Sequence, residues 1–389
     1  MKAKNPNTKR IVTIVLCDLA AFLLFSLGVC AIVFDFFGGD KDQMQEAKKL
    51  ATPAPSATQA PTDSPAPTDV PETDPADVPE TGSQEDGTQE PTPEPTPEPT
   101  QEPTGLLKGK YAEKFSSGEI VQTDTEYRSE NVAIELTHID GGFCVACSRV
   151  SNTKDACEHC GQAIKSANRQ EIYIADIYLN DINAFHSYAI SRQSELDKVK
   201  PMAEQFGALL ACNSDYYLNS KTGKHGWFVR DGVEIARFNS IDSDLCILYA
   251  DGTMDTIDYK NDSWSVDEIY AKYPQHIWYF GPVLLDNNGQ AKTEFNFHGH
   301  VAAANPRTVL GYYEPGHYAI LLVDGARSGG ESRGLTAEEL SVYCAELGLT
   351  KAYNLDGGGS SCLYFSGNIY GPNGRGTSDI IYIAEPSAQ

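Results

Sequence analysis

The chain has 389 residues, a formal net charge of −24, 41% hydrophobic residues and 10 cysteines. The hydrophobic fraction is sufficient for a buried core, which excludes a wholly disordered protein. The acidity disfavours nucleic acid as a partner, because acidic surfaces repel a phosphate backbone, and no run of Lys and Arg occurs beyond the extreme N-terminus.

The N-terminus has the pattern of a signal anchor. Residues 1–10 carry four basic side chains and no acid, and residues 11–34 are almost entirely apolar, with Asp18 as the only charge. Such a run can cross a hydrocarbon layer of ~30 Å as a helix, with its basic flank in the cytoplasm. We expect a cytoplasmic tail over residues 1–10 and a transmembrane helix over residues 11–37. The alternatives are a cleaved signal peptide, although no small-x-small cleavage site follows, and a lipoprotein signal ending at Cys30.

A Pro/Thr/Glu-rich linker is expected over residues 38–105. Within it, residues 51–104 contain 14 prolines, 12 acidic residues and no Lys, Arg or aromatic residue. A segment of this composition cannot bury enough apolar surface to offset the entropy of ordering it. Proline and charge repulsion keep it extended, so it predicts a disordered spacer that holds a C-terminal domain away from the membrane, outside the cell.

Residues 106–389 have the composition of a folded domain. Short apolar segments bounded by Gly, Asn and Asp predict strands. These segments are residues 132–136, 172–178, 245–249, 317–323, 352–355, 362–365 and 380–384. Helices are expected at 197–206 and at 336–347, where Thr336 and Glu339 form a capping-box pattern. The order of elements predicts an α+β fold, a strand-rich domain with mixed sheets and few helices.

Four cysteines form a CxxC-x9-CxxC pattern: Cys144, Cys147, Cys157 and Cys160. Two such pairs can present four thiolates to zinc in a tetrahedral arrangement. The pattern therefore predicts a zinc-ribbon-like insertion at about residues 141–165, with a structural role because no coordination position stays open. Two disulfides are the alternative, since the domain is expected outside the cell.

The C-terminal third contains the residues best suited to phosphate chemistry. Gly357, Gly358 and Gly359 are followed by two serines, Ser360 and Ser361. Consecutive glycines let the backbone approach a ligand, and their N–H groups can form an anion-binding nest. The adjoining aspartate, residue 356, could act as acid, base or nucleophile. A sequence of this kind alone is more often a tight turn.

Arginines elsewhere in this region could complete a phosphate site. Arg307 could hold phosphate oxygens with its bidentate fork, and Arg333 or Arg375 could form a second clamp. Arg307 could instead be a structural ion-pair partner.

Several motifs occur together in a fixed order. They are ACNSDYY at 211–217, FGP at 280–282, NPRT at 305–308, VDG at 323–325, ESRGLT at 331–336, NLDGGGSS at 354–361 and GRGTSD at 374–379. This set resembles the phosphodiester glycosidase family over roughly residues 120–385. The resemblance implies hydrolysis of the bond between a sugar's anomeric carbon and a phosphodiester oxygen.

Glycosidic hydrolysis usually needs two carboxyl groups. The candidate catalytic residues are Asp356, Asp324, Glu331 and Asp215. The candidate substrate and phosphate ligands are Asn213, Arg307, Arg333, Asn354, Gly357, Gly358, Gly359, Ser360, Ser361 and Arg375. No organic cofactor is expected. A calcium ion could bridge Asp side chains and phosphate, although no dedicated loop motif supports it.

Two functions are compatible with these observations. The first is a membrane-anchored hydrolase outside the cytoplasm that cleaves a phosphorylated glycan or wall polymer, such as a teichoic acid or an exopolysaccharide. The second is a non-catalytic module that binds anionic wall polysaccharide with the same residues. Release of sugar from a phosphodiester substrate distinguishes the two.

Overall fold

The structure is a computed structural model that describes residues 105–190, 196–215, 226–237, 242–296, 302–325 and 331–386. The expected cytoplasmic tail, transmembrane helix and nearly all of the expected linker lie outside the described residues. Within the described ranges, no helix combines the length and the apolar character needed to span a membrane.

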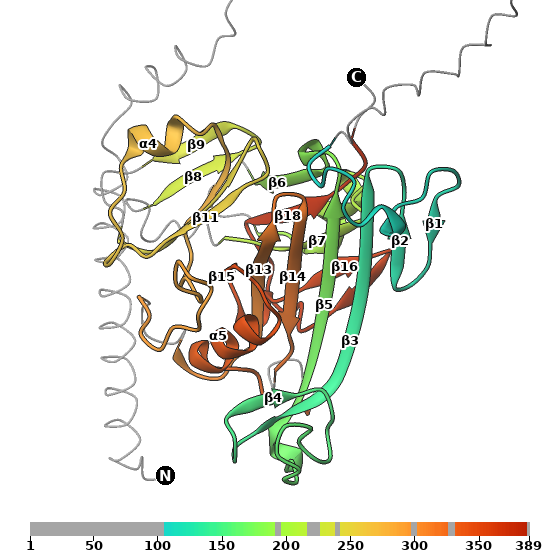
Figure 1. Ribbon diagram of the computed structural model, residues 1–389, viewed down its shortest axis with the longest axis vertical. Coiled ribbons are helices and arrows are strands. Elements are labelled where there is room, and N and C mark those ends of the chain that lie inside the picture. The colour runs from blue at the N-terminus through green and yellow to red at the C-terminus, as the bar shows by residue number, and fades with distance from the viewer. Residues whose placement is uncertain are drawn as a thin grey trace, which may run out of the picture. The chain divides into compact units, whose positions relative to one another are not determined.

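The largest sheet has eight strands and runs in the order β1-β2-β3-β5-β14-β13-β15, with β4 paired to β3. Its strands are β1 Val121–Gln122, β2 Glu126–Arg128, β3 Val132–Cys144, β4 Arg149–Ser151, β5 Arg169–Leu179, β13 Arg307–Glu314, β14 His317–Val323 and β15 Lys351–Asn354. β3 and β5 are long neighbours, paired from Val132 opposite Leu179 to Gly142 opposite Arg169. Figure 1 shows β4 at one end of this pair.

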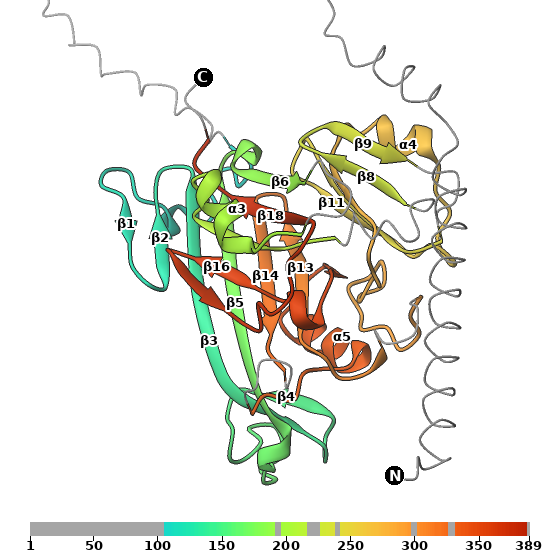
Figure 2. The same ribbon diagram turned by 180° about the vertical axis from the view of Figure 1, so that it is seen from behind.

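Two five-stranded sheets complete the domain, in the orders β17-β16-β7-β18-β6 and β11-β10-β12-β8-β9. The first contains β6 Phe185–Ala189, β7 Leu210–Asn213, β16 Leu363–Phe365, β17 Asn368–Tyr370 and β18 Asp379–Ile383. The second contains β8 Trp227–Arg230, β9 Val233–Arg237, β10 Leu245–Tyr249, β11 Met254–Ile257 and β12 Pro274–Trp278. Seen from behind, β16 and β18 lie in front of the large sheet (Figure 2).

The helices of the described residues are short. They are α3 Val199–Gln205, α4 Val266–Tyr270 and α5 Ala337–Glu346, with 3-10 turns at Ala112–Lys114, Ser166–Asn168, Ile182–Ala184 and Gly358–Ser360. At the start of α5, the Thr336 side chain accepts from the Glu339 N–H, and the Glu339 carboxylate accepts from the Thr336 N–H. The predicted capping box is therefore confirmed.

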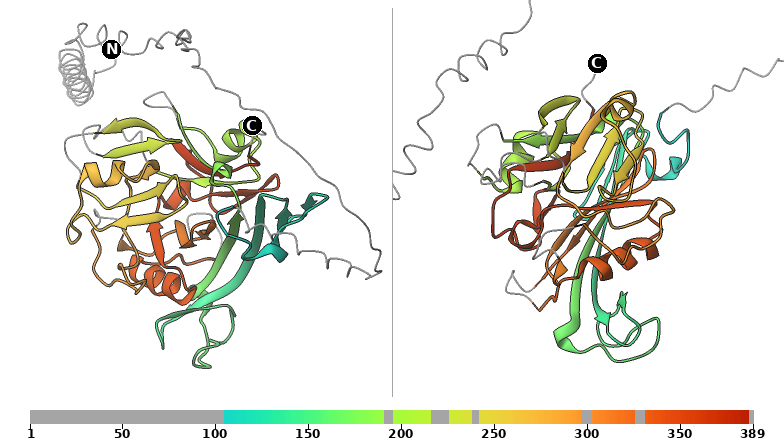
Figure 3. Two further views of the ribbon diagram at one scale, coloured as in Figure 1. Left: turned by 45° about the horizontal axis from the view of Figure 1, so that its top comes forward. Right: turned by 90° about the vertical axis from the view of Figure 1, so that its left-hand side faces the viewer.

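Apolar residues on both faces of the large sheet form the core. One face packs Ile134 and Ile177 against Leu210 and Ile381 of the second sheet and Trp278 of the third. On the other face, Val309, Leu321 and neighbouring residues pack against α5. The side view shows α5 on one side of β3 and β5 (Figure 3). Burying both faces fixes the sheet and its strand ends in place.

The predicted strand-rich fold with few helices is confirmed. The strands predicted at 245–249 and 317–323 have the predicted bounds, and α5 differs from its prediction only in the two capping residues. The sheets differ from the expectation of a mixed pattern, because every strand pair within the described ranges is antiparallel. β3 continues beyond residue 136 because β5 supplies backbone partners as far as Gly142.

Candidate functional site

The candidate site lies where strands of two sheets end. In the large sheet, Arg307 at the start of β13 lies opposite Val323 at the end of β14, and Asn354 ends β15. In the second sheet, Asn213 ends β7 opposite Ile380 near the start of β18. The turns that follow these strands carry most of the predicted site residues, so the sheets bring together motifs that are far apart in the sequence.

Asn213 joins the two sheets through its buried amide. Its Nδ2 donates to the Asp356 carbonyl at 2.5 Å. Its Oδ1 accepts from the Thr308 hydroxyl at 2.7 Å and from the Cys362 N–H at 3.0 Å. Through these bonds the Asn213 amide positions the turn after β15.

The glycine-rich turn lies tightly against the start of β13. Gly358 adopts a left-handed φ of +64°, which suits glycine, and its N–H donates to the Pro306 carbonyl at 2.9 Å. A Cβ on Gly357 would lie 2.8 Å from the same carbonyl oxygen. The N–H groups of Ser360 and Ser361 also donate within the turn. These three N–H groups therefore donate within the protein.

The carboxyl of Asp356 lies under this turn and contacts Arg375. Nη2 of Arg375 lies 2.9 Å from Oδ1 and 2.7 Å from Oδ2 of Asp356, and the Gly357 N–H donates to Oδ1 at 2.8 Å. Burial raises the pKa of Asp356 above its ordinary value, although Arg375 opposes the shift. A carboxyl that binds its proton more tightly can serve as a general acid.

Arg375 is fixed by the turn and still reaches solvent. Its Nε donates to the Ser360 hydroxyl at 2.7 Å, and its backbone N–H donates to the Gly359 carbonyl at 2.7 Å. Its side chain is 43% exposed, compared with 6% for Asp356. The arrangement combines a buried acid–base group with an accessible cation suited to phosphate oxygens.

A second ionic cluster is fully buried beside the first. Nη2 of Arg230 lies 2.9 Å from Oδ2 of Asp215 and 2.6 Å from Oδ2 of Asp379. Burial raises the pKa of Asp215, and it raises the pKa of Asp379 well above the ordinary value; in both cases Arg230 opposes the shift. One cation between two buried carboxyls favours keeping a proton on the pair. Asp215, a predicted catalytic residue, therefore lies in a buried ionic cluster, and its Oδ2 also accepts from the Tyr279 N–H.

Arg230 was not among the residues predicted from the sequence. It ends β8, a strand whose four residues are all buried, and its partners come from the turn after β7 and from β18. A buried arginine at the end of an apolar strand implies a carboxylate partner. That signal was present in the sequence, although it does not identify the partner.

The side chain of Arg307 is buried and directed toward backbone carbonyls. Its Nε donates to the Leu335 carbonyl at 3.0 Å, and its Nη2 donates to the Ala303 carbonyl at 2.6 Å. Burial lowers its pKa to about 10. Its backbone also approaches the Asp356 turn, since a Cβ on Gly357 would lie 3.9 Å from the Arg307 Cα. These contacts describe a residue that holds the surrounding loops in place.

The structure places Arg333 and Glu331 in other ion pairs. Arg333 binds the Glu339 carboxylate at 2.7 and 2.9 Å with its two terminal nitrogens. Its guanidinium therefore binds a carboxylate in the first turn of α5. Glu331, whose side chain is 75% exposed, pairs with Arg169. Neither contact involves Asp356.

Asp324 and Asn354 mark the ends of β14 and β15. The half-buried Asp324 side chain accepts from the Gly325 N–H at 2.6 Å. The buried Asn354 amide donates to the Gly281 and Leu355 carbonyls. Both residues support turns at the candidate site. The buried hydroxyl of Ser361 has no hydrogen-bond partner among the described residues.

The four clustered cysteines come together with the spacing of metal ligands. All four sulfur atoms lie within 4.8 Å of one another, with 3.5 Å between Cys144 and Cys160 and 3.6 Å between Cys147 and Cys157. Sulfurs bound to one tetrahedral zinc at ~2.3 Å would be about 3.8 Å apart, whereas a disulfide needs ~2.05 Å. The cluster therefore fits a metal such as zinc. Among the described residues, no other group of three or more His, Cys, Asp or Glu side chains is spaced to hold one ion.

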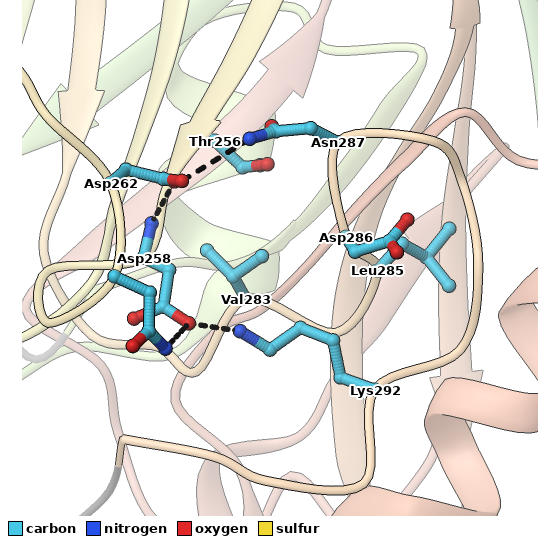
Figure 4. Close-up of a pocket in the computed structure, with 9 residues that line it drawn as sticks. Thr256, Asp258, Asp262, Val283, Leu285, Asp286, Asn287 and Lys292 are labelled. Atoms are coloured by element: carbon cyan, nitrogen blue, oxygen red, sulfur yellow. Dashed lines mark hydrogen bonds and ion pairs between the residues drawn. The ribbon is translucent and has the colours of Figure 1, made fainter.

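A polar hollow of about 190 Å³ lies apart from these residues. Its lining includes Asp258, Asp262, Asn287 and Lys292, and none of the predicted site residues. Lys292 pairs with Asp258, and the Asn287 amide donates to Asp262 (Figure 4). Its charged groups are largely satisfied by one another, so we assign no function to it.

Comparisons with known proteins agree with this geometry. A model of the phosphodiester glycosidase family matches residues 206–384. The catalytic domain of zebrafish N-acetylglucosamine-1-phosphodiester alpha-N-acetylglucosaminidase, solved in a form auto-inhibited by its pro-peptide, has a TM-score of 0.50 and 17% identity. That match covers 69% of this chain and 88% of the zebrafish chain, and at this identity it shows a shared fold.

A curated bacterial relative also matches. The SPbeta prophage-derived uncharacterized protein YomE of Bacillus subtilis (strain 168) is 26% identical over 168 residues, or 42% of this chain. The chain covers 25% of the length of YomE.

The antiparallel sheets of this chain thus have the fold of the zebrafish catalytic domain, and most of the sequence motifs lie within the residues that the family model matches. Residues 206–384 match the model of the phosphodiester glycosidase family, which confirms the resemblance drawn from the sequence motifs.

Proposed function

We propose that this chain is an enzyme that hydrolyses the bond between the anomeric carbon of a sugar and a phosphodiester oxygen. The observation that carries the proposal is the pair formed by buried Asp356 and partly exposed Arg375 at the end of β15, inside the matched domain. A carboxyl group can transfer a proton in this reaction, and a neighbouring cation can stabilise the charge on the departing phosphate.

The roles of the two residues follow from their environments. Water adds its oxygen to the anomeric carbon as the bond to the phosphate oxygen breaks, and the phosphate leaves with the bonding electron pair. Arg375 stabilises the negative charge on the departing phosphate. Asp356 handles a proton, either by giving one to the leaving oxygen or by taking one from water.

A direct assay tests the proposal. The full-length protein in detergent is incubated with UDP-N-acetylglucosamine and with a methyl phosphodiester of N-acetylglucosamine 1-phosphate, and free sugar is measured. We expect sugar release by the wild type that is lost in Asp356→Asn. Tight binding without sugar release across a broad panel would favour the alternative, a module that binds anionic wall polysaccharide.

We place the reaction outside the cell membrane, on a phosphorylated glycan or wall polymer. The support is the basic N-terminus, the largely apolar run over residues 11–34 and the proline-rich segment after it. Protease added to intact cells should remove the C-terminal domain and leave the basic tail protected. A protected C-terminal domain would contradict this orientation.

We propose zinc as the ion at the four cysteines. Thiolate sulfur is a soft ligand that favours zinc over calcium or magnesium, and the sulfur spacing suits tetrahedral binding. Four protein ligands leave no position for substrate, so the proposed role is structural.

A further inference from the structure

The four-cysteine segment lies between the two longest strands of the large sheet. Cys144 is the last residue of β3, β4 folds back onto it with Arg149 opposite Cys144, and β5 begins at Arg169. Its own apolar core consists of Cys144, Cys157 and Ile164, with Cys147 packed against them. A core this small stabilises a loop weakly, so four cysteine ligands on one metal would add substantially to what holds this segment.

The strand ends that flank the cysteines hold residues 331–333. The Arg333 N–H donates to the Arg169 carbonyl at 2.9 Å. The buried Ser332 hydroxyl accepts from the Gln170 amide at 2.8 Å and from the Glu171 N–H at 3.0 Å. The start of β5 therefore positions this segment.

The Arg333 guanidinium also lies 4.7 Å from the centre of the Phe143 ring, a cation–π distance. Phe143 directly precedes Cys144 in β3, so a displaced cysteine would disturb this contact as well.

The same segment continues to the candidate site through direct bonds. Leu335 and Asn305 exchange backbone hydrogen bonds at 3.1 and 3.2 Å, and the Leu335 carbonyl also accepts from Arg307 Nε. Pro306, between Asn305 and Arg307, accepts from the Gly358 N–H in the turn that covers Asp356. An unbroken series of contacts thus joins the cysteines to the carboxyl of Asp356, and coupling between distant groups travels through such contacts.

We infer that the metal-bound four-cysteine segment is a remote positioning element for the Asp356 turn. Metal binding fixes the ends of β3 and β5, these fix residues 331–335, and these in turn fix Pro306 and the glycine-rich turn. The effect on turnover rests on the proposed function, whereas the effect on the turn itself does not.

Three measurements on the full-length protein test the inference. Elemental analysis should find one zinc per chain. Removal of the zinc with a chelator should raise the hydrogen-exchange rate of amides in residues 331–335 and 357–361, because both stretches lose their fixed partner. Amides of β10 and β11, in the third sheet, should keep their exchange rates and serve as the internal control.

A matched variant tests the contact between residues 331–333 and β5 separately from the binding of the metal. Ser332→Ala removes the hydroxyl that binds Gln170 and Glu171 while leaving all four cysteines in place. It should retain zinc and still show faster exchange at residues 357–361. On a phosphodiester substrate, both the zinc-free protein and Ser332→Ala should lose several-fold in kcat.

The outcomes distinguish this inference from the proposed function. Two disulfides without zinc, or zinc removal that leaves exchange at 357–361 unchanged, would overturn the inference and leave the hydrolase proposal standing. Zinc-dependent exchange at 357–361 in a protein that cleaves no phosphodiester would overturn the hydrolase proposal and support the inference.

Discussion

Arg375 contacts Asp356 through one nitrogen, Nη2, which lies 2.9 and 2.7 Å from the two carboxylate oxygens. The carboxyl is almost fully buried while 43% of the arginine side chain remains exposed. A phosphate that approaches from solvent would therefore meet the cation first, and the carboxyl would act from beneath it. This order of exposure suits a reaction in which phosphate is the leaving group.

The substitution Asp356→Asn should abolish most of the activity. Asparagine has nearly the same shape and can still accept the Gly357 N–H, so the turn should keep its conformation, but it cannot exchange a proton. We expect kcat to fall by about two orders of magnitude or more, measured as sugar release from a sugar 1-phosphodiester. Circular dichroism would confirm that the variant is folded.

Glu331→Gln is the matched control. It changes a predicted catalytic carboxyl that the structure places on the surface with Arg169, and we expect near wild-type turnover. If Asp356→Asn retains its rate and Glu331→Gln loses it, the catalytic carboxyl is Glu331.

Replacing Arg375 should shift the pH dependence of the reaction. Arg375 lowers the pKa of Asp356 against the larger effect of burial, so Arg375→Gln should raise that pKa further. The limb of the kcat/KM profile that reports Asp356 should move to higher pH. Arg375→Lys retains a positive charge and should shift the limb less. An unchanged limb in Arg375→Gln would show that another group titrates.

The sequence predicts well those parts of the site that are local. The Asp356 turn and the cysteine pairs are contiguous motifs, so their chemistry is visible without a fold. The partner of each arginine could not be predicted from the sequence, because it depends on tertiary packing. The sequence did not distinguish Arg333 from Arg375 as the residue that would bind phosphate beside Arg307. In the structure Arg333 binds Glu339, six residues away, and only Arg375 reaches Asp356.

Long-range partners account for what the sequence did not reveal. Asp379 lies 149 residues from Arg230 along the chain, and Thr308 lies 95 residues from Asn213. No spacing rule connects such pairs, since they meet only where separate sheets end together. Strands such as β10 and β14 were predictable because burial on both faces gives continuous apolar segments, whereas β8, β12 and β13 were not predicted.

Arg307→Lys should lower stability more than it changes the chemical step. Arg307 is buried and donates to the Leu335 and Ala303 carbonyls, and a single ammonium group cannot reproduce both bonds. Losing one hydrogen bond from a charged donor should lower the free energy of unfolding by about 1.5–3 kcal/mol. Urea denaturation measures this change.

Arg375→Lys provides the comparison, because its side chain is partly exposed and should affect stability little. If Arg307→Lys instead keeps wild-type stability and raises KM strongly, Arg307 contacts the phosphate directly, as the sequence motif suggested.

The buried cluster of Asp215, Arg230 and Asp379 should make stability depend on pH. Burial raises the pKa of Asp379 well above the ordinary 3.8. At a pH between the ordinary pKa and the raised pKa, the folded protein holds a proton on Asp379 that the unfolded chain has released. The free energy of unfolding should therefore fall as pH rises above the ordinary pKa. Asp379→Asn cannot titrate and should show a shallower fall from about pH 4 upward. Urea denaturation at a series of pH values, followed by the fluorescence of buried Trp227 and Trp278, measures both slopes. Equal slopes in the two proteins would mean that Asp379 is ionised in the folded state, with Arg230 outweighing the effect of burial.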